Sequence, residues 1–296
     1  MRNGCALWNP DPDRWRGSRT VHSKNVARSS KLMIDSGNRA LHLVQPDDGV
    51  LGSLRILAGI APTREMYFAF ESETAPSPGS ALDVHAHARY DESEYVLTGE
   101  REIAVENQRW HAAPGFFALA PRHARHGMRT VGSAPSRWLH FFSPAGIERY
   151  FMERERLREA GADAAELRAL SQRHGVGAVI QSEDTENVYI SSPATRRDGI
   201  IVSGRTTRNA YALAEPAMLP EEEHAHPDQE EAFYVISGEL TLEVEGASVT
   251  APARSFVLVP RGLRRRHVTT IGTRVLAIFS PGRAVPHATH APVRPS

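Results

Sequence analysis

The chain has 296 residues, of which 41% are hydrophobic and 24% charged, as in ordinary globular proteins. Lys plus Arg and Asp plus Glu balance at 35 each, so net charge favours neither nucleic acid nor an acidic membrane as a partner. The single cysteine, Cys5, excludes an internal disulfide, and no apolar run approaches the roughly 18 residues of a membrane span. We therefore expect a cytoplasmic protein.

Residues 1–32 differ from the rest of the chain. Basic residues alternate there with Asn, Ser, Gly and Pro, without sustained periodicity. This composition predicts a mobile N-terminal arm. The alternative is an arm that packs on a barrel or on a partner subunit, with Trp8 and Trp15 as anchors.

Short β-rich runs follow from Ala40, and turn signals separate them. They read ALHLVQ, SLRILAGIA, EMYFAFESE, REIAVENQRWHAAPGFFALAP and RWLHFF. Many short strands at regular spacing predict an all-β sandwich or barrel. We place this first barrel at residues 33–144.

The stretch from Gly79 to Gly99 carries the clearest chemical signal. His85 and His87 are two residues apart, so on a β-strand both imidazoles leave the same face. The chain then turns and returns as a strand that begins near Glu92. Two imidazoles and one carboxylate facing a common point suit a divalent transition metal such as Fe, Mn, Ni, Cu or Co.

A fourth candidate ligand, His126, lies at the end of a second expected strand, after Gly115 and Pro121. An octahedral ion held by three imidazoles and one carboxylate keeps open positions, as catalytic metals do. A ligating Glu92 can also act as a base. His123 precedes the fourth ligand by three residues, and we predict that it lines the pocket as an acid–base or substrate contact.

Several nearby residues have competing interpretations. Glu94 is a rival ligand because it lies two residues beyond Glu92 on the same strand face. His111 flanks the site in sequence without a defined role. The alternating residues of the last strand are expected to be core or pocket wall: Trp138, His140 and Phe142.

A helical connector is expected at residues 145–176. Ser143 and Pro144 suit the N-cap and first position of a helix, and Gly161 suits its end. A shorter helix is expected from Ala164 to Leu170, ending near Gly175 or Gly177. The mixed charges of these segments indicate a solvated face.

A second series of β-rich runs follows, which indicates a second barrel at residues 177–283. Residues 284–296 are expected to form a C-terminal tail. His224, His226 and Glu231 reproduce the spacing of the first motif. Four pairs of positions share the same separation of 139 residues: His85 and His224, Glu92 and Glu231, Gly99 and Gly238, Pro121 and Pro260. Self-similarity of this length indicates an internal duplication.

The second copy departs from the first at the fourth ligand, where Arg265 stands in place of His126. A nearby imidazole, His267, becomes a ligand if a bulge shifts the strand. One interpretation is a second metal held by His224, His226, Glu231 and His267. The other is a structural barrel in which Arg265 neutralises Glu231 in place of a metal. A further alternative is an anion site formed by the basic run Arg261, Arg264, Arg265 and Arg266.

The two motif blocks resemble those of the cupin superfamily, G-x5-H-x-H-x3–4-E-x6-G and G-x5-P-x-G-x2-H-x3-N. The resemblance implies two tandem cupin barrels (double-stranded β-helix or jelly-roll) joined by the helical connector. It also implies a metal held by His85, His87, Glu92 and His126. The sequence departs from the second motif at His123, where the family has Gly, and at Thr130, where it has Asn.

The two-barrel layout is similar to that of quercetin 2,3-dioxygenases, over roughly residues 35–283. That resemblance implies a small hydroxylated aromatic or enolic substrate, O2 as co-substrate, and Glu92 as acceptor of the substrate proton. Two alternatives remain open: a metal-dependent isomerase, cyclase or lyase that needs no O2, and a non-catalytic small-molecule-binding protein. A homodimer is a further expectation from the cupin resemblance.

Overall fold

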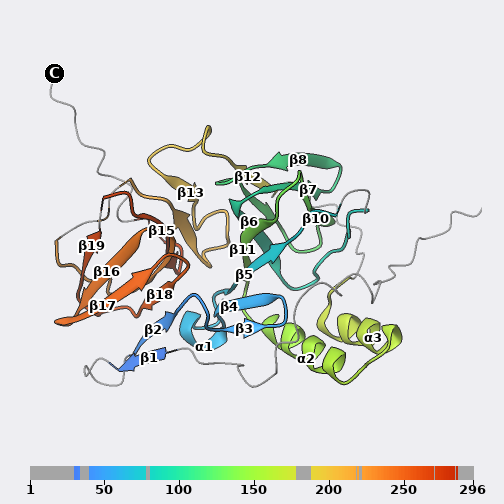
Figure 1. The fold of residues 1–296 in the computed structure, drawn as a ribbon, viewed down its shortest axis with the longest axis horizontal. Helices are drawn as coiled ribbons and strands as arrows, with labels where there is room; N and C mark the ends of the chain where they lie inside the picture. Colours follow the sequence, from blue (N-terminus) through green and yellow to red (C-terminus); the bar gives the residue numbers. More distant parts are fainter. Residues whose placement is uncertain are drawn as a thin grey trace, which may run out of the picture.

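The computed structural model describes residues 30–33, 40–77, 81–177, 188–217, 219, 222–269, 271–283 and 285. Most of the predicted arm and tail, and Gly79 of the first motif, lie outside these residues. Two β-barrels stand side by side, with a pair of helices packed beneath the first (Figure 1). The predicted all-β fold with two barrels and a helical connector is confirmed.

The first barrel consists of a large sheet and a small sheet that face each other. The large sheet has the order β12-β9-β6-β11-β5-β4-β3, and the small sheet has the order β10-β7-β8. All neighbouring strands pair antiparallel. The strands are β3 (Val50–Leu51), β4 (Leu54–Ala58), β5 (Phe68–Thr74), β6 (Asp91–Thr98), β7 (Glu100–Val105), β8 (Gln108–Ala112), β9 (Phe117–Ala120), β10 (His126–Val131), β11 (Ser136–Ser143) and β12 (Tyr189–Ser191).

The second barrel repeats this plan. Its large sheet has the order β1-β2-β18-β15-β20-β14-β13, and its small sheet has the order β17-β16-β19. The strands are β1 (Ser30–Met33), β2 (Ala40–Val44), β13 (Ile200–Val202), β14 (Ala212–Ala214), β15 (Glu230–Ser237), β16 (Glu239–Val244), β17 (Ala247–Pro252), β18 (Phe256–Val259), β19 (Arg265–Thr269) and β20 (Arg274–Ser280).

The two barrels exchange strands. β2 precedes the first barrel in sequence but pairs with β18 of the second, with Leu43 opposite Val257. Conversely, β12 follows the connector but pairs with β9 of the first barrel, with Ile190 opposite Ala118. The predicted domains are consecutive segments of the chain. The hydrogen bonds of β2 and β12 instead link strands on opposite sides of the predicted boundary at residue 177.

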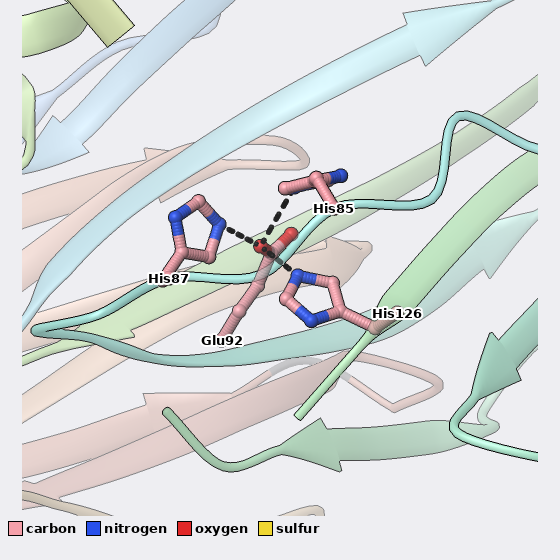
Figure 2. A group of neighbouring side chains, drawn as sticks. All are labelled: His85, His87, Glu92 and His126. Atoms are coloured by element: carbon pink, nitrogen blue, oxygen red, sulfur yellow. Dashed lines mark hydrogen bonds and ion pairs between the residues drawn. The ribbon is translucent and has the colours of Figure 1, made fainter. Parts of the chain in front are cut away.

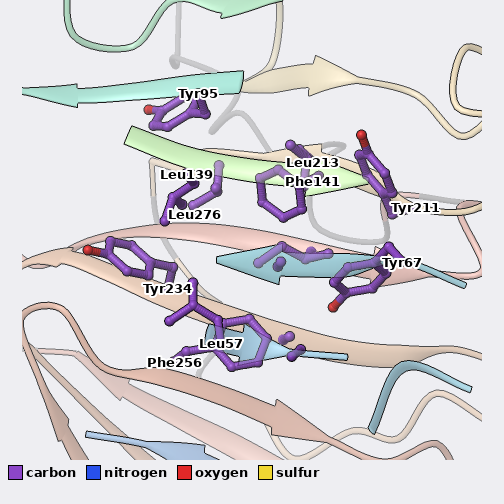
Figure 3. Close-up of a cluster of buried hydrophobic side chains, with 14 of the residues drawn as sticks. Leu57, Tyr67, Tyr95, Leu139, Phe141, Tyr211, Leu213, Tyr234, Phe256 and Leu276 are labelled. Atoms are coloured by element: carbon purple, nitrogen blue, oxygen red, sulfur yellow. The ribbon is translucent and has the colours of Figure 1, made fainter. Parts of the chain in front are cut away.

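A shared hydrophobic core joins the barrels. Its side chains come from both large sheets and include four tyrosines at the contact (Figure 3). The tyrosine hydroxyls find polar partners across the interface: Tyr95 donates to Glu215, Tyr234 donates to Glu71, and Tyr211 lies 2.6 Å from the Ser93 hydroxyl. Burial of this apolar surface makes the two barrels one packed unit.

The connector contains two helices, α2 (Glu148–Glu159) and α3 (Ala164–His174). The predicted start at Ser143 is wrong, because Ser143 ends β11 and Pro144 follows through a cis peptide bond. Asp163 and Glu166 form a capping box at the start of α3, and Gly175 ends it in the left-handed region. A further short helix, α1, spans Ile60–Thr63. None of the helices in the described ranges has the length and apolar character needed to cross a membrane.

Candidate metal centre

Three separate segments bring the four predicted ligands of the first barrel together. His85 and His87 lie outside the regular strands, in a segment held by isolated β-bridges rather than in the strand we expected. His85 and His126 exchange both backbone hydrogen bonds at 2.8 Å, which fixes one imidazole beside the other. Glu92 is the second residue of β6, and His126 is the first residue of β10.

The side chains converge on one carboxylate oxygen (Figure 2). Oε2 of Glu92 lies 2.7 Å from Nε2 of His87, 2.9 Å from Nε2 of His126 and 3.8 Å from Nε2 of His85. One ligand atom from each residue lies within 4.8 Å of all the others. Three side chains are at most 5% exposed, whereas that of His85 is 25% exposed. The group therefore opens to solvent on the His85 side.

The electrostatics of the group favour the metal-binding protonation states of His87 and Glu92. Burial lowers the pKa of His87 to about 4 despite the opposing Glu92, so this imidazole is neutral and its lone pair is available. Burial alone raises the pKa of Glu92, but contacts with His126, His140 and His85 outweigh it and hold that pKa well below 4.5. Burial lowers the pKa of His85, and Glu92 reverses this to a net increase.

This donor set fits a first-row divalent transition metal. Imidazole nitrogen suits Fe, Ni, Cu and Zn, and carboxylate oxygen also suits Mn. Four donors leave positions open on an octahedral ion, a feature of catalytic rather than structural sites. His85, His87, Glu92 and His126 are therefore the residues that would hold such an ion.

The structure adds a residue that the sequence did not assign to the site. His140, on β11, places Nδ1 3.0 Å from Oε1 of Glu92, the oxygen turned away from the three imidazoles. Trp138 and Phe142 on the same strand are buried, as expected for core or pocket wall. A signal was present in the sequence, because His140 alternates with two aromatic residues on an interior face.

Glu94, the rival ligand, belongs to a separate ion pair with Arg101. Arg101 also donates to Thr130 at 3.1 Å and to Ser136 at 3.2 Å, and its guanidinium stacks 3.5 Å above the Trp138 ring. Glu94 is absent from the group of candidate ligands found among the described residues. Its buried carboxylate is neutralised within the barrel interior instead.

His123 occupies a left-handed backbone conformation, with φ of +72°. This explains why the related motif has Gly at the same position. The His123 N–H donates to the carbonyl oxygen of His87 at 2.8 Å, and the buried Nδ1 has no hydrogen-bond partner among the described residues. His111 is 63% exposed, beside Glu100.

The second barrel contains a related but altered group. His224, His226 and Glu231 each offer a ligand atom within 4.8 Å of the other two. Arg265 exchanges backbone hydrogen bonds with His224 at 2.8 and 2.9 Å, as His126 does with His85. Its Nε donates to Oε2 of Glu231 at 2.8 Å, and both side chains are fully buried. The guanidinium thus occupies the place of the fourth ligand.

His267 keeps regular β19 pairing opposite Leu242, so the bulge that we considered is not present. Its Nε2 still lies 3.7 Å from Oε2 of Glu231. The basic run is not a set of unpaired cations, because each arginine pairs with a glutamate: Arg261 with Glu230, Arg264 with Glu245, Arg265 with Glu231 and Arg266 with Glu243. These pairs argue against an anion site there.

Comparison with known proteins agrees with this architecture. The family described as "Cupin domain" matches residues 74–142 and 214–280. A search among curated proteins finds no match.

Solved structures match over most of the chain. Protein YlbA from E. coli aligns with a TM-score of 0.56 at 9% identity, over 83% of this chain and 92% of its own. Two structures of oxalate decarboxylase from Bacillus subtilis align at 15% identity with TM-scores of 0.54 and 0.50, over 93% of this chain and 89% and 81% of theirs. Procruciferin, an 11S globulin from Brassica napus, aligns with a TM-score of 0.52 at 9% identity, over 81% and 84%. The chain therefore has the fold of two tandem cupin barrels, and one segment of each barrel matches the cupin domain.

Proposed function

We propose that the first barrel is the active centre of a metal-dependent oxidoreductase, a dioxygenase acting on a small hydroxylated aromatic or enolic compound. One observation carries this proposal: three imidazoles and one carboxylate converge on a common point, and His85 is the most exposed of the four side chains. A buried site with a single exposed edge suits a small molecule better than a polymer.

The metal would act as a Lewis acid for a substrate oxygen and as a binding site for O2. His85, His87 and His126 would hold it through their Nε2 atoms, and Glu92 through Oε2. Glu92 would accept the substrate's hydroxyl proton, and His123 would contact the substrate beside His87. Aromatic side chains on the buried side of the site would limit the access of water there; they include Phe142, whose ring centroid lies 5.3 Å from that of His87.

The resemblance to quercetin 2,3-dioxygenases supports the oxidative choice, and the solved structures suggest a second candidate. Oxalate decarboxylase shares the two-barrel fold, and one of its structures concerns its Mn(II) centres. A metal-dependent lyase that needs no O2 is therefore the alternative. At 15% identity the likeness establishes the fold alone.

We propose that the second barrel is structural and holds no metal. Arg265 supplies the positive charge that a metal would bring to Glu231, at the same backbone position as His126 in the first barrel. The expected content is then one metal per chain. The opposite case, a second metal on His224, His226, Glu231 and His267, predicts two.

Elemental analysis of the purified protein tests the site. We expect about one Fe, Mn, Ni, Cu or Co per chain, lost in His85→Ala but retained in the matched exposed variant His111→Ala. Absence of metal after reconstitution with each ion would overturn the enzyme proposal. Turnover of quercetin and related flavonols, compared in air and under argon, then separates the dioxygenase from the lyase.

A further inference from the structure

The two oxygens of Glu92 have different partners. Oε2 faces the three imidazoles of the candidate metal group. Oε1 lies 3.0 Å from Nδ1 of His140, on β11. A carboxylate with one oxygen in close polar contact with a neighbouring imidazole has a single oxygen left to offer an ion.

His140 is fixed by its surroundings. Its ring stacks on Phe70 at 4.6 Å, with 13° between the planes, and is nearly parallel to Phe142 at 5.9 Å. The ring of Trp138 meets it edge-on at 5.7 Å. Because the side chain is only 8% exposed and is enclosed by aromatic rings, it cannot turn away from Glu92 without repacking the core.

The second barrel provides an internal comparison. Phe142 pairs with Glu92 across the strands, and Phe279 pairs in the same way with Glu231. The residue two positions before Phe279 is Ala277, which therefore corresponds to His140. The histidine is present where the carboxylate belongs to a complete ligand set, and is missing where an arginine replaces a ligand.

We infer that His140 is a positioning residue that limits Glu92 to one ligating oxygen and so keeps a metal position open for substrate. The inference rests on the proposed metal centre. Without His140, Oε1 is free to chelate, and a two-oxygen carboxylate occupies a position that a substrate oxygen needs. His140 therefore controls ligand access while remaining outside the ligand set.

The test compares wild type with His140→Phe, which keeps an aromatic ring between Phe70 and Phe142 but removes Nδ1. His140→Asn restores a side-chain N–H near the Nδ1 position, and His111→Phe is an exposed control. Each protein is loaded with Co(II). Metal content, the visible Co(II) spectrum, X-ray absorption and the affinity for azide are then measured. Thermal unfolding verifies folding.

We expect His140→Phe to retain Co(II) but to bind azide about 10–100-fold more weakly, with an altered spectrum and an added carboxylate oxygen in the metal shell. His140→Asn and His111→Phe should resemble wild type. Wild-type spectrum and azide affinity in a folded His140→Phe would overturn the inference, as would failure of His140→Asn to restore them. Failure of wild type itself to bind Co(II) is a different result and would overturn the proposed function.

Discussion

At the residue scale, two side chains occupy backbone positions that favour glycine. His123 has φ of +72° and corresponds to Gly262, which has φ of +78° in the second barrel. Arg254 has φ of +71° and corresponds to Gly115, with φ of +87°. A non-glycine residue in this region costs on the order of 1–2 kcal/mol. The strained backbone of His123, beside the segment that carries His85 and His87, is consistent with a role for its imidazole.

His123→Gly should therefore stabilise the protein while weakening its activity. Relief of strain gains about 1–2 kcal/mol, and the extra freedom of glycine in the unfolded chain costs about 0.5–1 kcal/mol, so the net gain lies between about 0 and 1.5 kcal/mol. Calorimetry of the metal-free protein measures this gain, and turnover measures the lost substrate contact. The reverse change, Gly262→His, should lower stability. A lower melting temperature for His123→Gly would refute the strain argument.

The candidate ligand residues were predictable because their spacing is local, but the contact of His140 with Glu92 was not predicted. His85, His87, Glu92 and His126 follow a motif within 42 residues, and the first three return in the second copy as His224, His226 and Glu231. The contact of His140 with Glu92 depends instead on the register between β11 and β6, which places His140 opposite Glu94. Side-chain alternation predicts which face a residue occupies, but not which partner lies across the sheet.

At the element scale, we expect the first residue of β19, Arg265, to determine whether the second barrel holds a metal. Arg265→His puts an imidazole at the backbone position of a fourth ligand, beside His224, His226 and Glu231. We expect elemental analysis of this variant to give about two metals per chain instead of one. Without metal, the variant loses the partner of a buried Glu231, which costs about 3–5 kcal/mol. Its melting temperature should therefore rise on metal addition more than that of wild type, and unchanged metal content would contradict this account.

The sequence located the strands better than their partners. Apolar and β-branched runs predicted β2 and β12, but periodicity contains no information on which barrel each one joins. The Ser143–Pro144 pair was misread as a helix start, although the same Phe-Ser-Pro text recurs at Phe279, where β20 ends. In both copies the proline follows the last barrel strand through a cis bond. The helix begins four residues later, at Glu148.

At the scale of the whole molecule, ion pairs between buried carboxylates and half-exposed arginines tie the barrels together in a reciprocal pattern. Asp91 of the first barrel pairs with Arg208 of the second at 2.7 Å, and Glu230 of the second pairs with Arg64 of the first at 2.8 Å. Asp91 immediately precedes Glu92, and Glu230 immediately precedes Glu231, the carboxylates of the two candidate ligand groups. The interface therefore supports the segment on which each group is built.

Glu71 is the most highly connected carboxylate of this interface. It is 2% exposed and accepts hydrogen bonds from Arg55 and Tyr234, and from Arg254 of the second barrel at 2.8 and 3.0 Å. Burial alone raises the pKa of Glu71, but Arg55 and Arg254 outweigh it and lower that pKa below 4.5. Because the folded-state pKa is lowered, the stabilisation is complete above about pH 4.5 and is lost as pH falls through the folded value.

Glu71→Gln should accordingly cost about 3–5 kcal/mol at pH 7, because the buried guanidinium of Arg55 loses its counter-ion, while the partly exposed Arg254 adds little to this cost. The variant should also lose less additional stability than wild type between pH 5 and pH 3, since it lacks the carboxyl that takes up a proton. Urea unfolding at several pH values measures both effects. Glu153→Gln, at an exposed ion pair with Arg173, is the control and should change stability at pH 7 far less. Parallel pH profiles for wild type and Glu71→Gln would show that Glu71 does not govern the acid sensitivity of the interface.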